Sequence, residues 1–142
     1  MPIPAPDLTR TFPRSPSERL GGLAHLPRMI DKARADRAGA LGEYSYPCPM
    51  DRRALDFLGL DAGQFQETAV THDDAALLEW LESHAVPRSK PEKDAFSAEI
   101  LALAPDTPEK LAHFKEALEA AAPGRTDITT WAQLIDADEG RI

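Results

Sequence analysis

The sequence predicts an all-α fold: a single compact domain of six to eight short helices, with an extended N-terminal arm and a proline-rich loop. Helix starts marked by Ser, Thr or Asp, and stops marked by Gly or Pro, recur about once per 12–18 residues. Runs of β-branched residues, which would favour strands, are almost missing. The 142 residues suffice for about one domain. We therefore divide the chain into an arm, residues 1–14, and one helical domain, residues 15–142.

The arm holds four of the 13 prolines, which favours an extended segment that lies on the surface or moves freely. Ser15-Pro16 followed by Glu18 has the form of a helix start. Gly21-Gly22 weakens a helix at that point, so we expect only a short turn there.

The first full helix is expected over roughly residues 27–38. Pro27 fits a first turn and Gly39 is a suitable stop. Residues 41–50 lack helical character, because Pro47 and Pro49 impose extended conformations on the residues before them. We expect a rigid extended loop there, or at most an edge strand.

Each later helix follows a residue that can cap its N-terminus. These pairs are Asp51 with 52–58, Asp61 (with Gln64) with 62–70, Asp73 with 74–85, Ser89 and Glu92 with a helix that carries Phe96 and Ile100, Thr107 with 108–122, and Thr130 and Gln133 with a last short helix.

The composition and the charge of the chain argue against nucleic-acid binding and against a membrane-spanning or signal segment. The net charge of −8 and the isoelectric point near 4.9 speak against nucleic-acid binding, which needs a basic surface. No stretch approaches the roughly 18 apolar residues of a membrane helix, and the first residues lack the pattern of a signal peptide. The single cysteine suits a reducing compartment, so we expect a cytoplasmic protein.

The acidity is unevenly distributed along the chain. Residues 1–60 hold nine basic and seven acidic residues, a net charge of +2, whereas residues 61–142 hold seven and 17, a net charge of −10. The slightly basic first part also contains both tyrosines and the only cysteine. It is therefore the place to expect a site, with acidic helices as its scaffold.

Residues 42–53 concentrate the reactive side chains in a loop held by prolines, a common setting for binding residues. Arginines near a helix start can hold a carboxylate or phosphate. The candidate ligand-binding residues are Arg28, Arg34, Tyr44, Tyr46, Cys48, Arg52 and Arg53.

Cys48 is also a candidate nucleophile, with His25 as its base, if a neighbouring base or cation lowers the thiol pKa. The alternative is that Cys48 is a small buried apolar residue and Asp51 only a helix cap. The spacing to Arg52 and Arg53 does not fit a cysteine-phosphatase loop. One Cys and four scattered His do not form a zinc motif, and Cys48-Pro49 is too short a signal for haem. We expect no metal and no cofactor.

Several ordered motifs resemble an uncharacterised bacterial family, domain of unknown function 5069. They are Leu20-Gly21-Gly22, Leu26-Pro27-Arg28-Met29-Ile30-Asp31-Lys32, Gly42-Glu43-Tyr44, Cys48-Pro49-Met50-Asp51-Arg52, Phe57-Leu58-Gly59 and Arg125-Thr126-Asp127-Ile128. Some relatives carry a histidine where this chain has Ser45. The resemblance implies a single compact domain and brings no activity with it.

Three functions stay open from the sequence. The first is a small non-catalytic binding or protein-interaction protein, favoured because no complete catalytic motif is visible. The second is binding of a small anionic ligand near Tyr44, Arg28, Arg34 and Arg52. The third is a thiol-dependent enzyme that uses Cys48 and His25. The partner is therefore either another protein or a small anion.

Overall fold

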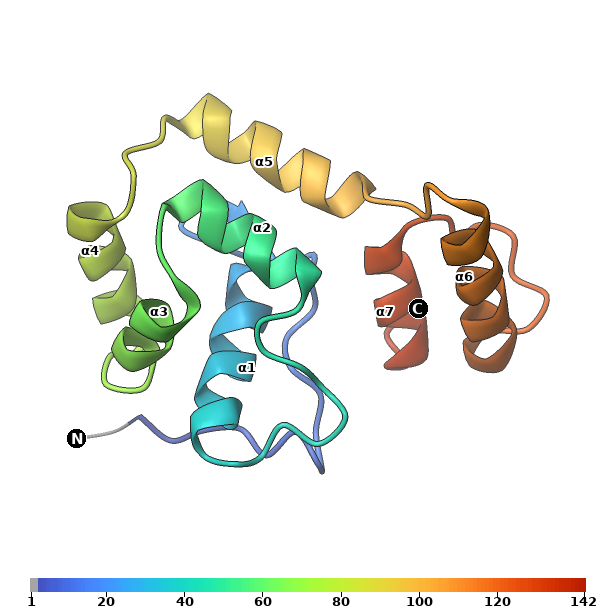
Figure 1. Ribbon diagram of the computed structural model, residues 1–142, viewed down its shortest axis with the longest axis horizontal. Helices are drawn as coiled ribbons and strands as arrows, with labels where there is room; N and C mark the ends of the chain where they lie inside the picture. Colours follow the sequence, from blue (N-terminus) through green and yellow to red (C-terminus); the bar gives the residue numbers. More distant parts are fainter. Residues whose placement is uncertain (1–2) are drawn as a thin grey trace.

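The computed structural model describes residues 3–142 and confirms the all-α expectation (Figure 1). Residues 1–2 of the expected arm lie outside the described part. The helices are α1 (Leu26–Arg37), α2 (Pro49–Leu58), α3 (Ala62–Ala69), α4 (Asp74–His84), α5 (Lys90–Ala102), α6 (Pro108–Ala121) and α7 (Trp131–Asp138). No helix of the described residues is long and apolar enough to cross a membrane.

Five predicted helix starts are confirmed by their caps. The side-chain oxygens of Asp61, Asp73, Ser89, Thr107 and Thr130 each accept the backbone N–H three residues ahead. Ser89 with Glu92 and Thr130 with Gln133 form reciprocal capping boxes. Such a cap contributes about 1 kcal/mol to helix stability. Each of these short helices therefore begins directly after its capping residue, which can be recognised in the sequence.

The turn expected near residue 20 is a small β-hairpin instead. Strands β1 (Arg19–Leu20) and β2 (Leu23–Ala24) pair antiparallel, with Leu20 opposite Leu23. Gly21 and Gly22 form its two-residue turn, with φ of 60° and 82°. Two positive φ values favour glycine and match the twist of a hairpin. The glycine pair therefore marks this turn as well as breaking a helix.

Helix α2 begins earlier than predicted, and Asp51 is not its cap. Cys48 is the N-cap residue, and Pro49 occupies the first helical position, where its missing N–H costs nothing. Asp51 lies in the first turn, and its Oδ2 accepts the backbone N–H of Cys48 at 2.9 Å. The shift places both side chains at the N-terminal end of one helix.

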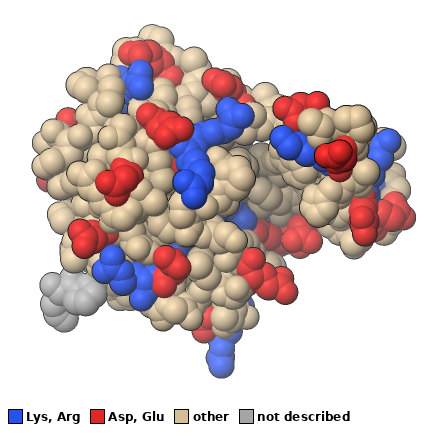
Figure 2. Space-filling model, viewed as in Figure 1, with Lys and Arg blue, Asp and Glu red and all other residues tan. Residues whose placement is uncertain are grey.

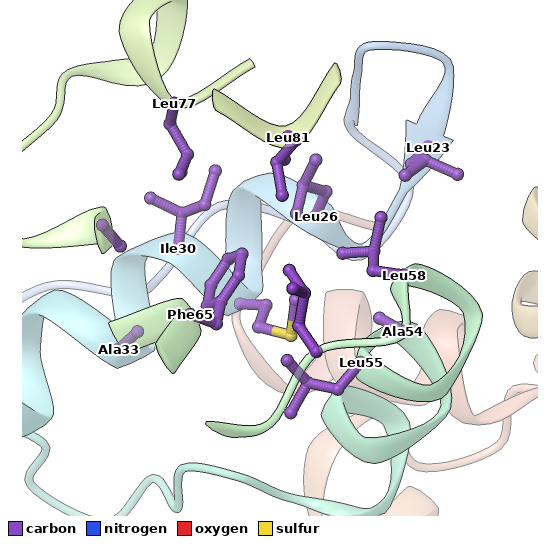
Figure 3. Close-up of a cluster of buried hydrophobic side chains, with 13 residues drawn as sticks. Leu23, Leu26, Ile30, Ala33, Ala54, Leu55, Leu58, Phe65, Leu77 and Leu81 are labelled. Carbon is purple, nitrogen blue, oxygen red and sulfur yellow. The ribbon is translucent and has the colours of Figure 1, made fainter. Parts of the chain in front are cut away.

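The main core lies between the first four helices (Figure 3). Met29 and Ile30 of α1 and Phe65 of α3 are fully buried there. The described part of the arm lies on this body: Leu8 is buried, and its N–H donates to the carbonyl of Ala40 at 2.9 Å. Helix α1 is thus covered on several sides.

Helices α6 and α7 stand side by side at the far end of the molecule (Figure 1). They have their own small core of Phe114, Ile128, Leu134 and Ala137. The Trp131 ring packs edge-on against Phe114, and the Trp131 backbone N–H donates to the carbonyl of Leu103 at 3.0 Å. This pair of helices therefore forms a wall beside the main body, facing the start of α2.

Candidate active site

Four chemically reactive side chains meet where α1 begins and α2 begins. His25 directly precedes α1, and Lys32 follows it by two helical turns on the same helix. Cys48 and Asp51 lie at the N-terminus of α2. The two helix ends thus bring residues from distant parts of the sequence into one cluster, which we call the thiol cluster.

Asp51 is the centre of the thiol cluster. Its Oδ1 lies 2.7 Å from His25 Nε2, and its Oδ2 lies 2.7 Å from Lys32 Nζ. Lys32 Nζ also donates to Cys48 Sγ at 3.1 Å. The sulfur of Cys48, a ring nitrogen of His25 and a carboxylate oxygen of Asp51 all lie within 4.8 Å of one another.

The partners of the sulfur are withdrawn from solvent. The side chains of His25, Lys32 and Asp51 are exposed by 1%, 4% and 0%. Charges are costly at such depth unless they are paired. The contacts among these groups therefore hold them in one arrangement, and Cys48 is the partly exposed member of the set.

The surroundings alter three pKa values. Burial raises the pKa of the Cys48 thiol, but contact with His25 and the charge of Lys32 outweigh it, so the pKa lies below its ordinary value. Burial lowers the pKa of His25, but its contacts with Asp51 and Cys48 raise the pKa by a larger amount, so the net change is upward. Burial opposes ionisation of Asp51, yet His25 and Lys32 lower its pKa to about 2. These changes all favour a thiolate beside an imidazolium.

The backbone of His25 is held in an unfavourable conformation. Its φ of 72° lies in the left-handed region, and it is the one non-glycine residue with positive φ among those described. Its Nδ1 is buried and has no hydrogen-bond partner in the described part of the chain. Strained residues and unsatisfied buried polar atoms cluster at functional sites. Both features make His25 a candidate functional residue.

Cys48 opens onto a cavity of about 370 Å³. Its apolar lining comes from α2, from the residues just after α5 and from α7, and consists of Pro49, Met50, Leu103, Ala104, Trp131 and Ile135. Arg53, Asp106 and Lys110 add charge to it. Figure 2 shows the molecule hollowed between the α6–α7 pair and the main body. The volume lies in the range of small-molecule sites.

His25, Cys48 and Asp51 are also residue types that ligate metals. Lys32 already donates to the sulfur and forms an ion pair with the carboxylate, so its ammonium group occupies the place where a cation would be bound. A metal ion there would have to displace that lysine or share the space with a like charge. The donor set therefore fits thiol chemistry better than metal binding.

Two of the predicted anion-binding residues are engaged with a carboxylate beside the thiol cluster. Arg28 donates two hydrogen bonds to Glu139, at 2.9 and 2.8 Å. The Tyr44 hydroxyl donates to the same carboxylate at 2.7 Å, and the Arg28 guanidinium lies 5.4 Å from the Tyr44 ring centre. Arg141 is a further partner of Glu139. Glu139 thus occupies the position that an anionic ligand was expected to take.

The other predicted residues lie in separate surroundings. Arg34 is buried and donates to Asp74 and to the carbonyls of Ala69 and His72. The Tyr46 hydroxyl donates to the carbonyl of Ala62.

Arg52 and Arg53 are both exposed on α2 but serve different surfaces. Arg52 borders a depression near Gly59, whereas Arg53 borders the Cys48 cavity. Of the predicted residues, Cys48 and Arg53 border one cavity, and His25 lies buried within 4.8 Å of the Cys48 sulfur.

Sequence reasoning missed Lys32 and treated Asp51 as a cap. A signal for each was available. His25 and Lys32 are seven residues apart, which places them on one face of a helix. Asp51 follows Cys48 by three residues, the spacing of a capping box, in which the third helical side chain turns back toward the N-cap.

Comparison with known proteins gives a family without an assigned function. No curated protein matches the chain. One family model, described as a domain of unknown function, DUF5069, matches residues 10–141 and so includes every residue of the thiol cluster. The chain therefore belongs to the DUF5069 family.

Proposed function

We propose that the protein is a thiol-dependent enzyme in which Cys48 is the nucleophile. The observation that carries this proposal is the 3.1 Å contact between Lys32 Nζ and Cys48 Sγ, in a cluster completed by His25 and Asp51. A thiolate is the reactive form of cysteine, and neighbouring cations stabilise it. Its position at the N-cap of α2 adds the favourable end of the helix dipole.

The proton of the thiol has a local acceptor. Its transfer from Cys48 to His25 changes a thiol and a neutral imidazole into a thiolate and an imidazolium, and the total charge of the cluster stays the same. Asp51 orients the imidazole ring through the 2.7 Å contact with Nε2. His25 is then the acid that returns the proton to a leaving group.

A non-catalytic anion-binding role has less support. Arg28 and Arg34 are buried and their guanidinium groups are already paired with Glu139 and Asp74. Binding an external anion would require these pairs to break, which is costly at buried positions. Thiol chemistry needs no such rearrangement.

A reducing compartment, the cytoplasm, fits this role best. Cys48 is a free cysteine, and its reactive state must survive without oxidation. We place the protein there as part of the same proposal.

The test is the pH dependence of alkylation by iodoacetamide, followed by the intact mass of the protein. Native Cys48 is compared with the same cysteine in the chain unfolded by guanidinium chloride, which is its matched control. We expect the native thiol to keep reacting at pH 6–7, where an ordinary thiol with a pKa of about 8.5 is almost fully protonated. A native profile that follows the unfolded chain, or a cysteine that does not react at any pH, would overturn the proposal.

A further inference from the structure

We infer that the substrate is the thioester of an aliphatic acyl group with an anionic carrier thiol, and this inference rests on the proposed nucleophilic role of Cys48. The structure points to the three parts of such a molecule separately. The cavity fits the acyl chain, the thiol cluster fits the reacting carbonyl, and cations at the rim fit the carrier.

The cavity beside the sulfur suits an aliphatic chain. Met50, Leu103 and Ile135 present apolar side chains to it, and Trp131 contributes an aromatic surface. Burial of apolar area favours binding by about 25 cal/mol per Å². A chain of several carbons therefore gains more from this cavity than an acetyl group does.

The rim of the cavity carries two accessible cations. The Arg53 side chain is 53% exposed, and its nearest carboxylate, on Glu99, is 3.9 Å away. Lys110 is 60% exposed and pairs with Asp106 at 3.2 Å. Unlike Arg28 and Arg34, these cations can turn toward a ligand at little cost. They suit the phosphate groups of a carrier that extends out of the cavity.

The chemistry of a low-pKa thiolate selects the thioester. In the tetrahedral intermediate two sulfurs have similar leaving ability, so the carrier thiolate can depart unaided, whereas an alcohol or an amine departs only after His25 has protonated it. A carrier thiol has a pKa of about 8.5, close enough to compete. The backbone N–H of Met50 has no acceptor within the described chain and can donate to the developing oxyanion.

The acylation step is balanced without an oxidant or reductant. Cys48 Sγ attacks the carbonyl carbon, a carbon–sulfur bond forms, and the bond to the carrier sulfur breaks. The carrier leaves with the proton that His25 holds. Water then releases the acid, with its proton taken by His25 and returned to the sulfur.

The experiment measures the acyl group on Cys48 by intact mass, and release of the carrier thiol, with acetyl- and octanoyl-coenzyme A. Octanoyl-N-acetylcysteamine has the same acyl group on an uncharged carrier. We expect adducts with the octanoyl thioesters, faster with coenzyme A, and at least about fivefold slower reaction with the acetyl compound.

Two variants, each with a control, test separately the cavity for the acyl chain and the rim cations for the carrier. Ala104 is exposed and borders the cavity, so Ala104→Leu should lower the ratio of octanoyl to acetyl transfer. Ala102→Leu, exposed but outside the cavity, is its control. The double change Arg53→Ala and Lys110→Ala should lower the ratio of the coenzyme A ester rate to the uncharged ester rate about fivefold. Arg37→Ala with Lys115→Ala is the control for lost charge.

The outcomes separate this inference from the proposed function. If Cys48 is alkylated readily at pH 6–7 but is never acylated, its role as a nucleophile is retained and the thioester substrate is contradicted. Acylation without preference for chain length or carrier also overturns the assigned substrate class. A cysteine that is inert toward iodoacetamide removes the proposed function itself.

Discussion

Lys32 Nζ lies 3.1 Å from Cys48 Sγ and 2.7 Å from Asp51 Oδ2. One buried ammonium group therefore contacts both the nucleophile and the carboxylate that orients His25. With the thiolate and imidazolium formed, the cluster contains two positive and two negative groups. Such a balanced set can exist at depth, whereas any one of these charges alone could not. The pairing explains how a sulfur in an apolar wall can be ionised.

Replacing Lys32 should return the pKa of the Cys48 thiol toward its ordinary value. In Lys32→Met the side chain keeps its length and loses its charge, so the pKa of Cys48 should rise and its alkylation at pH 7 should slow about tenfold for each unit of that rise. The pH profile of iodoacetamide reaction measures it. Lys93→Met, on α5 and away from the cluster, is the control. An unchanged profile in a variant that still unfolds cooperatively would contradict the role of Lys32.

His25 combines a chemical and a conformational requirement, which two variants can separate. Asn tolerates the left-handed backbone better than most residues, so His25→Asn should fold while losing the imidazole. We expect it to show slow alkylation at pH 7 and normal helical circular dichroism. His25→Ala should be less stable than His25→Asn in a thermal unfolding experiment. Equal stability would show that φ at this position is not a constraint.

The helices could be predicted because their signals are local. Thr130 with Gln133, for example, specifies the start of α7 within four residues. The hairpin at Gly21-Gly22 was missed because glycine both breaks helices and forms tight turns, and the sequence alone does not show which effect decides the local structure.

The site could be predicted only in part. Cys48 and His25 attract attention as residue types, but their meeting depends on how the loop before α2 returns to the start of α1. Glu139 lies 111 residues from its partner Arg28, and nothing local in the sequence indicates that pair. The sequence therefore suggested free arginines where the fold supplies an internal carboxylate.

The stability of the protein should fall at acid pH through Asp51. Its pKa is about 2 in the folded protein and about 3.8 otherwise, so its contribution is present above about pH 4 and is lost as the pH falls toward 2. The difference corresponds to roughly 2 kcal/mol. Urea unfolding between pH 2 and 6 measures it. In Asp51→Asn this part of the pH dependence should vanish, whereas Asp73→Asn at an exposed cap should retain it.

His25 acts at the other end of the pH scale. Its pKa is raised in the folded protein, so its contribution is full below the ordinary value of about 6.5 and is lost as the pH rises through the folded value. Above neutral pH this loss should lower the free energy of unfolding, whereas Cys48, whose pKa is lowered in the folded protein, acts in the opposite direction. His25→Asn should remove that decline, and its persistence in the variant would assign it to another group.

Glu139 joins the wall of the cavity to the main body, so its loss should affect stability and reactivity together. Glu139→Ala leaves the buried guanidinium of Arg28 and the hydroxyl of Tyr44 without their acceptor. Breaking a buried ion pair in this way costs about 3–5 kcal/mol, measured by chemical unfolding. Glu109→Ala, on the exposed first turn of α6, should cost little. Because α7 also lines the cavity, the Glu139 variant should lose chain-length preference even where Cys48 is still alkylated. A variant that unfolds easily but retains the preference would show that the cavity does not depend on this pair.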